Sequence, residues 1–359
     1  MAQTERHGGS HLPTTWETIA EVAYNTDTFG STEVTVLPGE GDKTFLAPPI
    51  TSDPPFHGKA RRILLPRFSP RAVEALRPAT EATVNSLLDS IEQGETADAA
   101  TDFAQHVPVR VISHMLGVPA SDEAQFLQWA IQIFQPSHDD PGAGRTATKE
   151  IFAYFAEVVE ERRQHPGEDD LVSDLLRAEL DGAPLTPKHV LGSCLLLLMA
   201  GIDTTWSSLS ASLWHLATHP ADRDRLVNEP SLLPTAIEEF LRAYAPVTMA
   251  RIANHDTEIA GCPVKAGDRV LLPFPAGNRD SSKFDRPNEV IIDRAQNRHF
   301  AFGLGIHRCL GSNLARMELE VGIGLWLQRF PQFSLIDGAD VQWRGAQVRG
   351  PRQVPVRLR

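Results

Sequence analysis

One uninterrupted apolar segment limits the folds that this chain can adopt. It begins at Thr186–Pro187, where threonine can cap a helix and proline suits the first helical position. No further proline occurs before His219–Pro220. The segment predicts one helix of roughly 33 residues, about 50 Å long, which would cross a whole globular domain. Its longest nearly uncharged run, Val190–Ile202, is shorter than the roughly 20 residues that span a bilayer, so we expect a buried core helix.

Helical spacing of apolar residues marks further segments on both sides of this helix. The additional predicted helices cover residues 57–66, 70–93, 103–116, 234–245 and 310–330. Extended patterns occur at 31–37, 258–264 and 269–273, and polar loops are expected at 137–147 and 164–170. We therefore expect a mainly α protein with small β-sheets. Because no linker separates two cores, residues 1–359 should form a single domain.

Charge and cysteine content restrict the partners and the compartment. The formal net charge is −12, so we expect no general binding to nucleic acid or to an anionic membrane, both of which need a basic surface. The three cysteines, Cys194, Cys262 and Cys309, do not form a paired framework, and the N-terminus has neither an apolar export signal nor a twin-arginine start. These features predict a soluble, cytoplasmic protein, and we expect a monomer.

The segment around Cys309 carries the strongest chemical signal. It reads Phe302-Gly-Leu-Gly-Ile-His307-Arg-Cys309-Leu-Gly311 and precedes the last predicted helix. Its three glycines permit sharp turns and the close approach of a flat ligand. The positive end of the helix dipole and free backbone amides would lower the pKa of the thiol and favour metal ligation. A lone cysteine could also be a buried structural residue, but the whole decapeptide resembles the haem-binding loop of the cytochrome P450 family.

The resemblance to cytochrome P450s implies a fold and a reaction. The implied fold is shaped like a triangular prism, with haem b between the long central helix and the Cys-bearing helix. Cys309 would bind the haem iron, and one atom of O₂ would enter a small hydrophobic substrate while the other leaves as water. Because the sequence contains no flavin or iron–sulfur motif, electrons would come from NAD(P)H through a separate reductase and a ferredoxin or flavodoxin.

Two other functions of the same fold stay open at this stage. One is a peroxygenase that takes its oxygen atom from H₂O₂. The other is a non-catalytic haem sensor or ligand carrier. The first alternative does not require proton delivery to dioxygen, so the residues in the middle of the long helix bear on the choice.

The middle of the long helix contains residues that are unfavourable in an apolar helix. Ala200-Gly201-Ile-Asp203-Thr204 places a glycine and a carboxylate in an apolar helix, where both are unfavourable. A structural kink with a satisfied aspartate is one interpretation. The segment also resembles the oxygen-binding groove of the family, where a helix distortion opens space beside the iron. By that resemblance Ala200 and Gly201 border the haem, Thr204 hydrogen-bonds dioxygen, and Asp203 passes protons towards it, which weighs against the peroxygenase.

Cationic residues elsewhere resemble the family's partners for the haem propionates. His57 and Arg61 have i, i+4 spacing in a predicted helix and resemble its His-x-x-x-Arg clamp. Arg251 and His299 complete the set that the resemblance implies. Phe302 would pack near the thiolate. Taken singly, each of the four cations could equally be a surface arginine or a capping histidine.

A pair of charged residues precedes the cysteine loop. Glu239 and Arg242 have i, i+3 spacing, which in isolation indicates a surface salt bridge worth at most about 1 kcal/mol. The pair resembles the family's Glu–Arg pair, with Arg294 as its third member. That resemblance implies a role in folding and haem retention.

The resemblance also implies surfaces for partners and substrate. A redox partner would dock on a basic patch whose candidate members are Lys59, Arg62, Arg67, Arg71 and Arg308. Residues 196–200, 247–250 and 347–348 resemble substrate-contacting segments and are mostly small or apolar, so a modest hydrophobic ligand is expected. The family usually has an extra helix and strand before residues 11–23, and this part of the fold is expected to be shortened.

Overall fold

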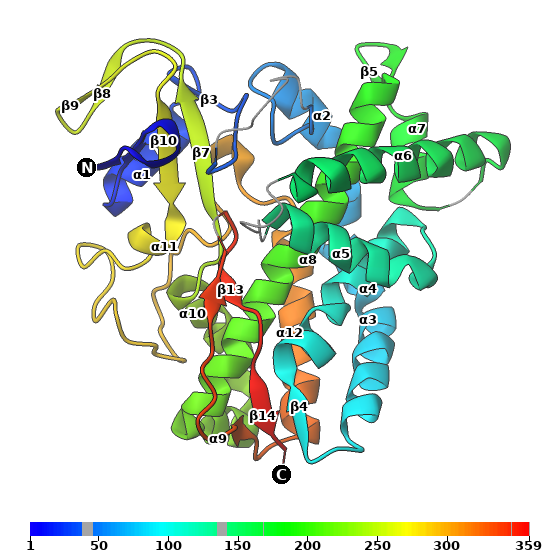
Figure 1. The fold of residues 1–359 in the computed structure, drawn as a ribbon, viewed down its shortest axis with the longest axis vertical. Coiled ribbons are helices and arrows are strands. Elements are labelled where there is room, and N and C mark those ends of the chain that lie inside the picture. The colour runs from blue at the N-terminus through cyan, green and yellow to red at the C-terminus, as the bar shows by residue number, and fades with distance from the viewer. Residues whose placement is uncertain (38–45, 135–141, 168, 346, 359) are drawn as a thin grey trace.

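The computed structural model describes residues 1–37, 46–134, 142–167, 169–345 and 347–358. Viewed down its shortest axis, the molecule has a triangular outline that is broad at one end and narrow at the other (Figure 1). Its α-helices are α1 (Trp16–Tyr24), α2 (Phe56–Leu64), α3 (Pro70–Ile91), α4 (His106–Leu116), α5 (Glu123–Phe134), α6 (Ala143–Gln164), α7 (Leu171–Arg177), α8 (Pro187–Thr218), α9 (Pro220–Asn228), α10 (Leu233–Ala243), α11 (Phe274–Gly277) and α12 (Ser312–Arg329).

The strands are short and form small sheets. They are β1 (Ala2–Thr4), β2 (Ser10–Leu12), β3 (Phe29–Gly30), β4 (Thr96–Asp98), β5 (Glu179–Leu180), β6 (Ala183–Pro184), β7 (Thr248–Ala253), β8 (Thr257–Ile259), β9 (Cys262–Val264), β10 (Arg269–Pro273), β11 (Ser334–Leu335), β12 (Trp343–Arg344), β13 (Gly350–Pro351) and β14 (Pro355–Arg357). The mainly α architecture with small β-sheets is as the sequence predicts.

The long helix α8 is the central element of the helical body. The Thr186 hydroxyl caps it by accepting a hydrogen bond from the His189 amide, and Pro187 takes its first position as predicted. Its most apolar window of 18 residues has a mean hydropathy of 1.4, which by length and composition would suit a membrane span. However, 72% of that window is buried inside the protein, as in a core helix.

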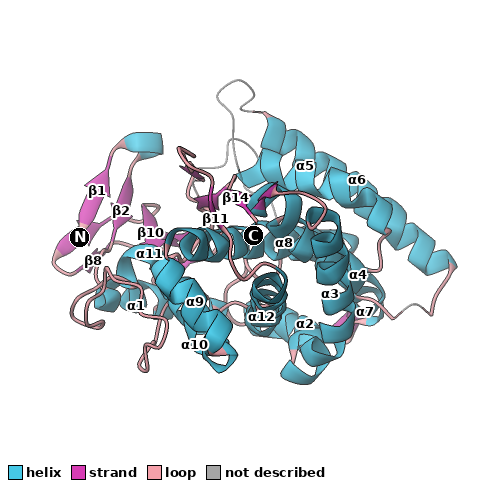
Figure 2. Ribbon diagram, turned by 90° about the horizontal axis from the view of Figure 1, so that it is seen from below, coloured by secondary structure: helices cyan, strands magenta, loops and turns pink. Residues whose placement is uncertain are grey.

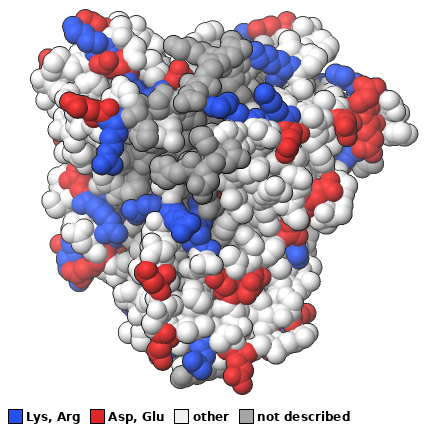
Figure 3. Space-filling view, viewed as in Figure 1, with Lys and Arg blue, Asp and Glu red and all other residues white. Residues whose placement is uncertain are grey.

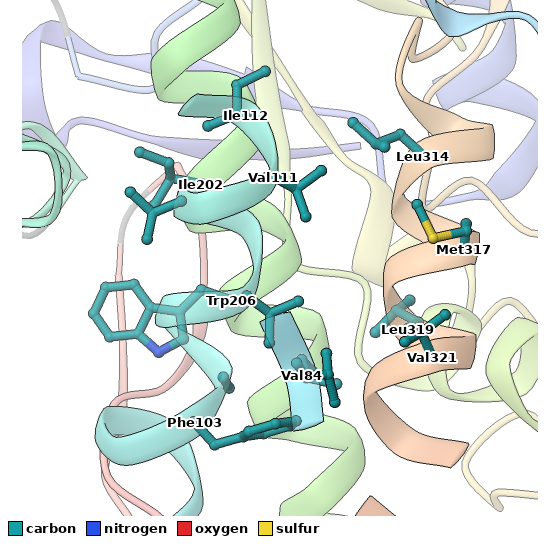
Figure 4. Close-up of a cluster of buried hydrophobic side chains, with 14 of the residues drawn as sticks. Val84, Phe103, Val111, Ile112, Ile202, Trp206, Leu314, Met317, Leu319 and Val321 are labelled. Atoms are coloured by element: carbon teal, nitrogen blue, oxygen red, sulfur yellow. The ribbon is translucent and has the colours of Figure 1, made fainter. Parts of the chain in front are cut away.

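The main core lies where α8 meets α3, α4 and α12. Figure 4 shows Val84, Val111, Ile202, Trp206 and Leu319 among the side chains that fill the space between these helices. Each fully buried side chain of this kind contributes about 1.5–3 kcal/mol relative to its exposed state. The helix predicted at 103–116 begins later, at α4, because the preceding residues form a π-helical turn, Ala99–Ala104. This core fixes α8 and α12 relative to each other.

The largest sheet lies to one side of the helical body (Figure 2). Its strand order is β1-β2-β10-β7-β3; β2 and β10 are parallel, and the other pairs are antiparallel. A second apolar cluster, which includes Ile19 and Val22 of α1, packs against it. The sheet supplies β7, which borders the site described below.

Three local predictions need correction. Residues 31–37 do not form a strand: β3 ends at Gly30, and the next amide, that of Ser31, donates to the Asp53 carboxylate (3.0 Å) instead of to a neighbouring strand. Residues 258–264 form a β8–β9 hairpin whose turn has positive φ at Ala260 (47°) and Gly261 (76°). The loop predicted at 137–147 is partly helical, since α6 begins at Ala143, while residues 137–141 lie outside the described part of the chain.

Candidate active site

A cavity of about 1290 Å³ lies between α8 and the loop that precedes α12. Ala200, Gly201 and Thr204 of α8 line one side, and Phe302 and Cys309 line the other. Helices α2 and α6 and strand β7 close its remaining walls. Most of the lining is apolar, and the few polar groups therefore define what the cavity can hold and do.

The loop before α12 presents Cys309 to this cavity. Gly303 (φ 66°) and Gly305 (φ 64°) adopt left-handed conformations that favour glycine. A Cβ on Gly305 would also lie 2.6 Å from the Ala23 carbonyl oxygen. The Cys309 amide donates to the Phe302 carbonyl (2.7 Å), which closes the loop. The exposed surface of Cys309 faces the cavity, so the residue is open to a ligand there although the protein surrounds it.

The electrostatic setting of the thiol has opposing contributions. Burial raises the pKa of Cys309, while a backbone hydrogen bond from Gly311 and the charges of Arg61, Arg308 and Arg316 lower it. The net direction is upward for the protein without a bound group because burial outweighs the other causes, whereas the Gly311 amide at the helix terminus lowers the pKa as predicted. A bound metal ion deprotonates a coordinating thiol by its own charge. The surrounding cations and amide would then stabilise the thiolate.

Four cationic or titratable groups line the cavity beside the cysteine loop: His57, Arg61, Arg251 and His307. Burial lowers the pKa of Arg251 to about 10, with Asp53 opposing the shift. Burial lowers the pKa of His307 to about 2, with further lowering by Arg251, His57 and Arg61. His307 is therefore neutral at neutral pH, and the positive charges of Arg61 and Arg251 at this wall favour an anionic ligand.

The hydrogen bonding of these groups leaves donors free to face a ligand. His57 is buried, yet its Nε2 atom has no hydrogen-bond partner among the described residues. Its ring meets the His307 ring edge to face, with centroids 4.4 Å apart. Arg61 Nη2 donates to the Arg308 carbonyl (2.6 Å), and Arg251 Nη1 donates to its neighbour's carbonyl, that of Ala250 (2.7 Å). Buried polar groups normally have partners, so the free His57 nitrogen indicates a ligand that completes the site.

His299 does not belong to this group, which corrects the sequence analysis. Its Nε2 atom lies 3.1 Å from a carboxylate oxygen of Glu238, and its Nδ1 accepts from the Ala301 amide (3.2 Å). Both ring nitrogens are thus occupied, and His299 is not among the residues that line the cavity. The sequence analysis missed His307, although it stands two residues before Cys309 in the quoted loop. Its position in that loop, two residues before the thiol, could have indicated that it lines the same cavity.

Phe302 begins the cysteine loop and packs against Arg316 of α12. It lines the cavity, and its ring stacks under the guanidinium of Arg316, whose Cζ lies 4.4 Å from the ring centroid. Arg316 in turn donates to both oxygens of Glu238. The ring is therefore held in place next to the thiol by a cation–π contact and an ion pair.

On the opposite wall, α8 stays helical through residues 200–205. The expected distortion is therefore not seen in the helix assignment. The Thr204 hydroxyl faces the cavity and donates to the Ala200 carbonyl (2.8 Å). A Cβ on Gly201 would lie 3.1 Å from Ile112, so glycine at this position allows close packing against α4.

Asp203 points away from the cavity. Its carboxylate is fully buried and accepts from Arg352 Nη1 (2.5 Å) and Nη2 (3.1 Å). The same guanidinium stacks on Trp206, with Cζ 4.7 Å from the ring centroid. Burial raises the pKa of Asp203, and Arg352 opposes that shift. The pairing of Arg352 with Asp203 could not be predicted from local sequence patterns, because the two residues are 149 positions apart.

A second carboxyl group lines the cavity and was also missed. Glu318 of α12 is buried, and burial raises its pKa to about 8, with a hydrogen bond from Thr205 opposing the shift. It is therefore protonated at neutral pH and does not counter the cations across the cavity. Its spacing within α12 offered no distinguishing pattern in the sequence.

The Glu239–Arg242 pair is fully buried, so the interpretation as a surface salt bridge is wrong. Arg242 donates to both oxygens of Glu239 (2.8 Å each), and Arg294 Nε donates to one of them (2.9 Å). Arg242 also donates to the carbonyls of Asn278 and Pro287, which lie beyond β10. The cluster ties α10 to the segment that leads into the cysteine loop.

These residues fit a haem. A b-type haem needs an axial ligand under its iron and cationic or hydrogen-bonding partners for two propionates. Cys309 offers the first, and the free His57 nitrogen with the buried Arg251 offers the second. No cluster of three or more His, Cys, Asp or Glu residues suited to a metal ion occurs in the part of the chain that the structure describes.

Comparisons with known proteins agree with this geometry. The family model for cytochrome P450 matches residues 43–342. Over 312 residues the chain is 38% identical to cytochrome P450 CYP107DY1 of Priestia megaterium, covering 86% of this chain and 76% of that protein. It is 36% identical to the 6-deoxyerythronolide B hydroxylase of Saccharopolyspora erythraea, covering 86% and 77% of the two chains.

Solved structures show the same fold. CYP109E1 from Bacillus megaterium, in complex with testosterone, superposes with a TM-score of 0.89 at 32% identity, over 97% of this chain and 91% of that one. The agreement covers the helical body, the small sheets and the cysteine loop together. The chain therefore belongs to the bacterial cytochrome P450 family and is a cytochrome P450 monooxygenase.

Proposed function

We propose that the chain uses a haem held by Cys309 to insert one atom of O₂ into a small hydrophobic substrate. The observation that carries the proposal is the placement of the Cys309 thiol and the Thr204 hydroxyl on opposite walls of one mostly apolar cavity. The overall reaction consumes the substrate, O₂, two electrons and two protons, and yields the oxygenated product and water. Haem, when bound through a thiolate, supplies the activation of dioxygen and favours cleavage of its O–O bond.

The residues of the cavity take separate parts in this proposal. Cys309 coordinates the iron, and Phe302 shields the thiolate. The propionates are bound by the cationic group that lines the cavity edge, namely His57, Arg61, Arg251 and His307. His307 replaces His299 in this role because its side chain lines the cavity. Ala200 and Gly201 border the haem face on the side of α8.

Proton delivery is proposed to involve Thr204 and Asp203. The Thr204 hydroxyl faces the cavity and can turn from the Ala200 carbonyl to donate to dioxygen. Asp203 is bound by Arg352, so its carboxylate must turn from that guanidinium to take up a proton and pass it on. Arg352 thus sets the resting position of the proton donor.

The thiolate ligand is tested by the absorption spectrum of the reduced protein with carbon monoxide. Wild type and Cys194→Ala, whose cysteine is buried away from the cavity, should both show the strongly red-shifted Soret band of thiolate-ligated haem. Cys309→Ala should lose it. A band at the position typical of histidine-ligated haem in the wild type would contradict the assignment.

Electrons are proposed to come from NAD(P)H through a reductase and a ferredoxin or flavodoxin. Two members of the expected docking patch are neutralised: Lys59 donates to Asp181 (2.6 Å), and Arg67 donates to Asp169 and Asp174 (both 2.5 Å). The remaining three have exposed side chains without an acidic partner in the described residues: Arg62, Arg71 and Arg308. They are the better candidates for contact with an acidic partner.

The docking surface can be tested by charge reversal. Arg62→Glu with Arg71→Glu should lower turnover driven by ferredoxin and reductase at least tenfold, and the loss should shrink as salt is added. Turnover with hydrogen peroxide should stay unchanged because it needs no electron donor. An equal loss with both oxidants would contradict docking at this patch.

The two alternative functions are distinguished by the same assays. A peroxygenase would form product faster with hydrogen peroxide than with O₂ and reduced ferredoxin. A sensor would bind ligand and form no product from either source. A monooxygenase of the bacterial family is expected to act in the cytoplasm, where NAD(P)H and its reductases are available.

A further inference from the structure

We propose that the substrate is an elongated carboxylic acid, whose carboxylate is held at the cavity mouth by Lys149 and Lys188. Its apolar part would extend from there along α8 towards Thr204. The inference rests on the proposed monooxygenase function and adds the chemical class of the substrate.

Two lysines from different helices line the same cavity at its outer end. Lys149 belongs to α6 and Lys188 to the first turn of α8, and both side chains are exposed as well as lining the cavity. Neither lysine has an acidic partner among the described residues. Figure 3 shows Lys and Arg side chains interspersed with Asp and Glu side chains over the upper part of the molecule.

The carboxyl groups of the lining do not offset these two charges. Glu33 is bound by Arg269, and Glu318 is buried with a pKa raised to about 8, so it is protonated at neutral pH. The N-terminal end of α8, beside Lys188, adds the positive end of its helix dipole. The mouth therefore attracts an anionic group.

The wall between the mouth and Thr204 is apolar. Lys188 and Thr204 lie on the same helix, about 24 Å apart along its axis at 1.5 Å per residue. The α8 residues that line the cavity in this interval are mostly leucines with a methionine: Leu191, Leu195, Leu196, Leu197 and Met199. Phe152 of α6 lines the cavity opposite them. This arrangement suits a long amphiphile with one charged end more than a compact ring system.

The test compares ligands of equal chain length and different head group. Binding of dodecanoate and 1-dodecanol to the haem-loaded protein is measured by calorimetry below their aggregation limits. A chain of twelve carbons is shorter than the stretch of α8 from Lys188 to Thr204, so these probes test the head-group site without having to reach the haem. Wild type should bind dodecanoate at least tenfold more tightly than 1-dodecanol. The double variant Lys149→Gln/Lys188→Gln should lose this preference, while its affinity for 1-dodecanol stays unchanged.

Two further variants sharpen the result. Lys265→Gln removes an exposed lysine of the loop after the β8–β9 hairpin, outside the cavity lining, and should keep the wild-type preference. Lys149→Glu/Lys188→Glu should instead favour dodecyltrimethylammonium, a cation that cannot ligate iron. Equal binding of acid and alcohol by wild type, or a preference that survives in the Gln double variant, would overturn the proposal.

The carbon monoxide spectrum of each sample distinguishes a failure of the substrate class from a failure of the haem assignment. A thiolate band without a carboxylate preference overturns only the substrate class. A missing band overturns the haem assignment itself, whatever the ligand binding shows.

Discussion

The inner edge and the mouth of the cavity both carry cationic side chains, but those at the inner edge are buried and those at the mouth are exposed to solvent. At the inner edge the cation Arg251 is 4% exposed, and beside it His57 is 3% exposed, with its pKa lowered by burial towards the neutral form. At the mouth Lys149 and Lys188 are exposed, and neither has an acidic partner among the described residues. A buried charge is costly to desolvate unless it is matched, whereas an exposed one costs little. The inner set therefore requires a resident anion, such as a haem propionate, while the mouth can serve a ligand that comes and goes.

Substitutions at the inner edge, or in the Glu239–Arg242 cluster that ties α10 to the segment before the cysteine loop, are therefore expected to affect stability and haem retention. Substitutions at the mouth are expected to affect only which ligand binds. Three experiments test this division, beginning with the largest expected effect.

Arg242→Ala should destabilise the protein most. It leaves the buried Glu239 carboxylate with Arg294 and with hydrogen bonds from Ile291 and Asn297, and breaking a buried ion pair from one side costs about 3–5 kcal/mol. A lower melting temperature and a lower haem content per chain are the expected readings. As a matched control, Arg225→Ala removes an exposed pair with Asp293 and should change neither. A wild-type melting temperature for Arg242→Ala would show that the cluster does not support the cysteine loop.

Asp203→Asn should act on the reaction and leave the haem in place. The amide keeps the shape of the side chain but cannot deliver a proton, so turnover with O₂ and a reduced partner should fall about 100-fold. Product formed from hydrogen peroxide, which brings its own protons, should fall much less. The ratio of the two rates is the measurement. Equal losses would place Asp203 in a structural role with Arg352.

Arg251→Gln should speed haem loss about tenfold, measured as transfer of haem to an excess of apomyoglobin. The lost charge is buried and faces the cavity, so a propionate partner disappears. The variants His299→Gln and Lys149→Gln/Lys188→Gln should keep the wild-type rate. If the mouth variant released haem as fast as Arg251→Gln, the division between inner edge and mouth would be wrong.

Much of the fold was predictable because helix and strand boundaries depend on residues close together in the chain, such as caps and prolines. The absence of proline between Pro187 and Pro220, together with a capping threonine, specified α8 almost to the residue. The boundaries of β10 and α3 were also predicted closely. Segments without such signals were predicted less well, as at residues 31–37, where a carboxylate takes the amide that a strand partner would have bound.

The site was predictable in part. The residues of the cysteine loop and of α8 stand in patterns short enough to recognise, and the structure brings Cys309, Phe302, Thr204, His57, Arg61 and Arg251 to one cavity. The choice of His299 over His307 failed because a histidine's partners are set by packing. Glu238, on another helix, engages His299 and removes it from the cavity.

The sequence by itself determined the long helix, the turn that presents the thiol and the family to which both belong, since these depend on residues close together in the chain. The tertiary structure decided that Arg352 meets Asp203 and that Glu238 meets His299. It also decided that Lys149 and Lys188 line the same cavity. It also decided that burial would raise the pKa of the thiol despite the helix terminus beside it. Solvent exclusion and long-range pairing arise only when distant segments pack, and no local pattern encodes them.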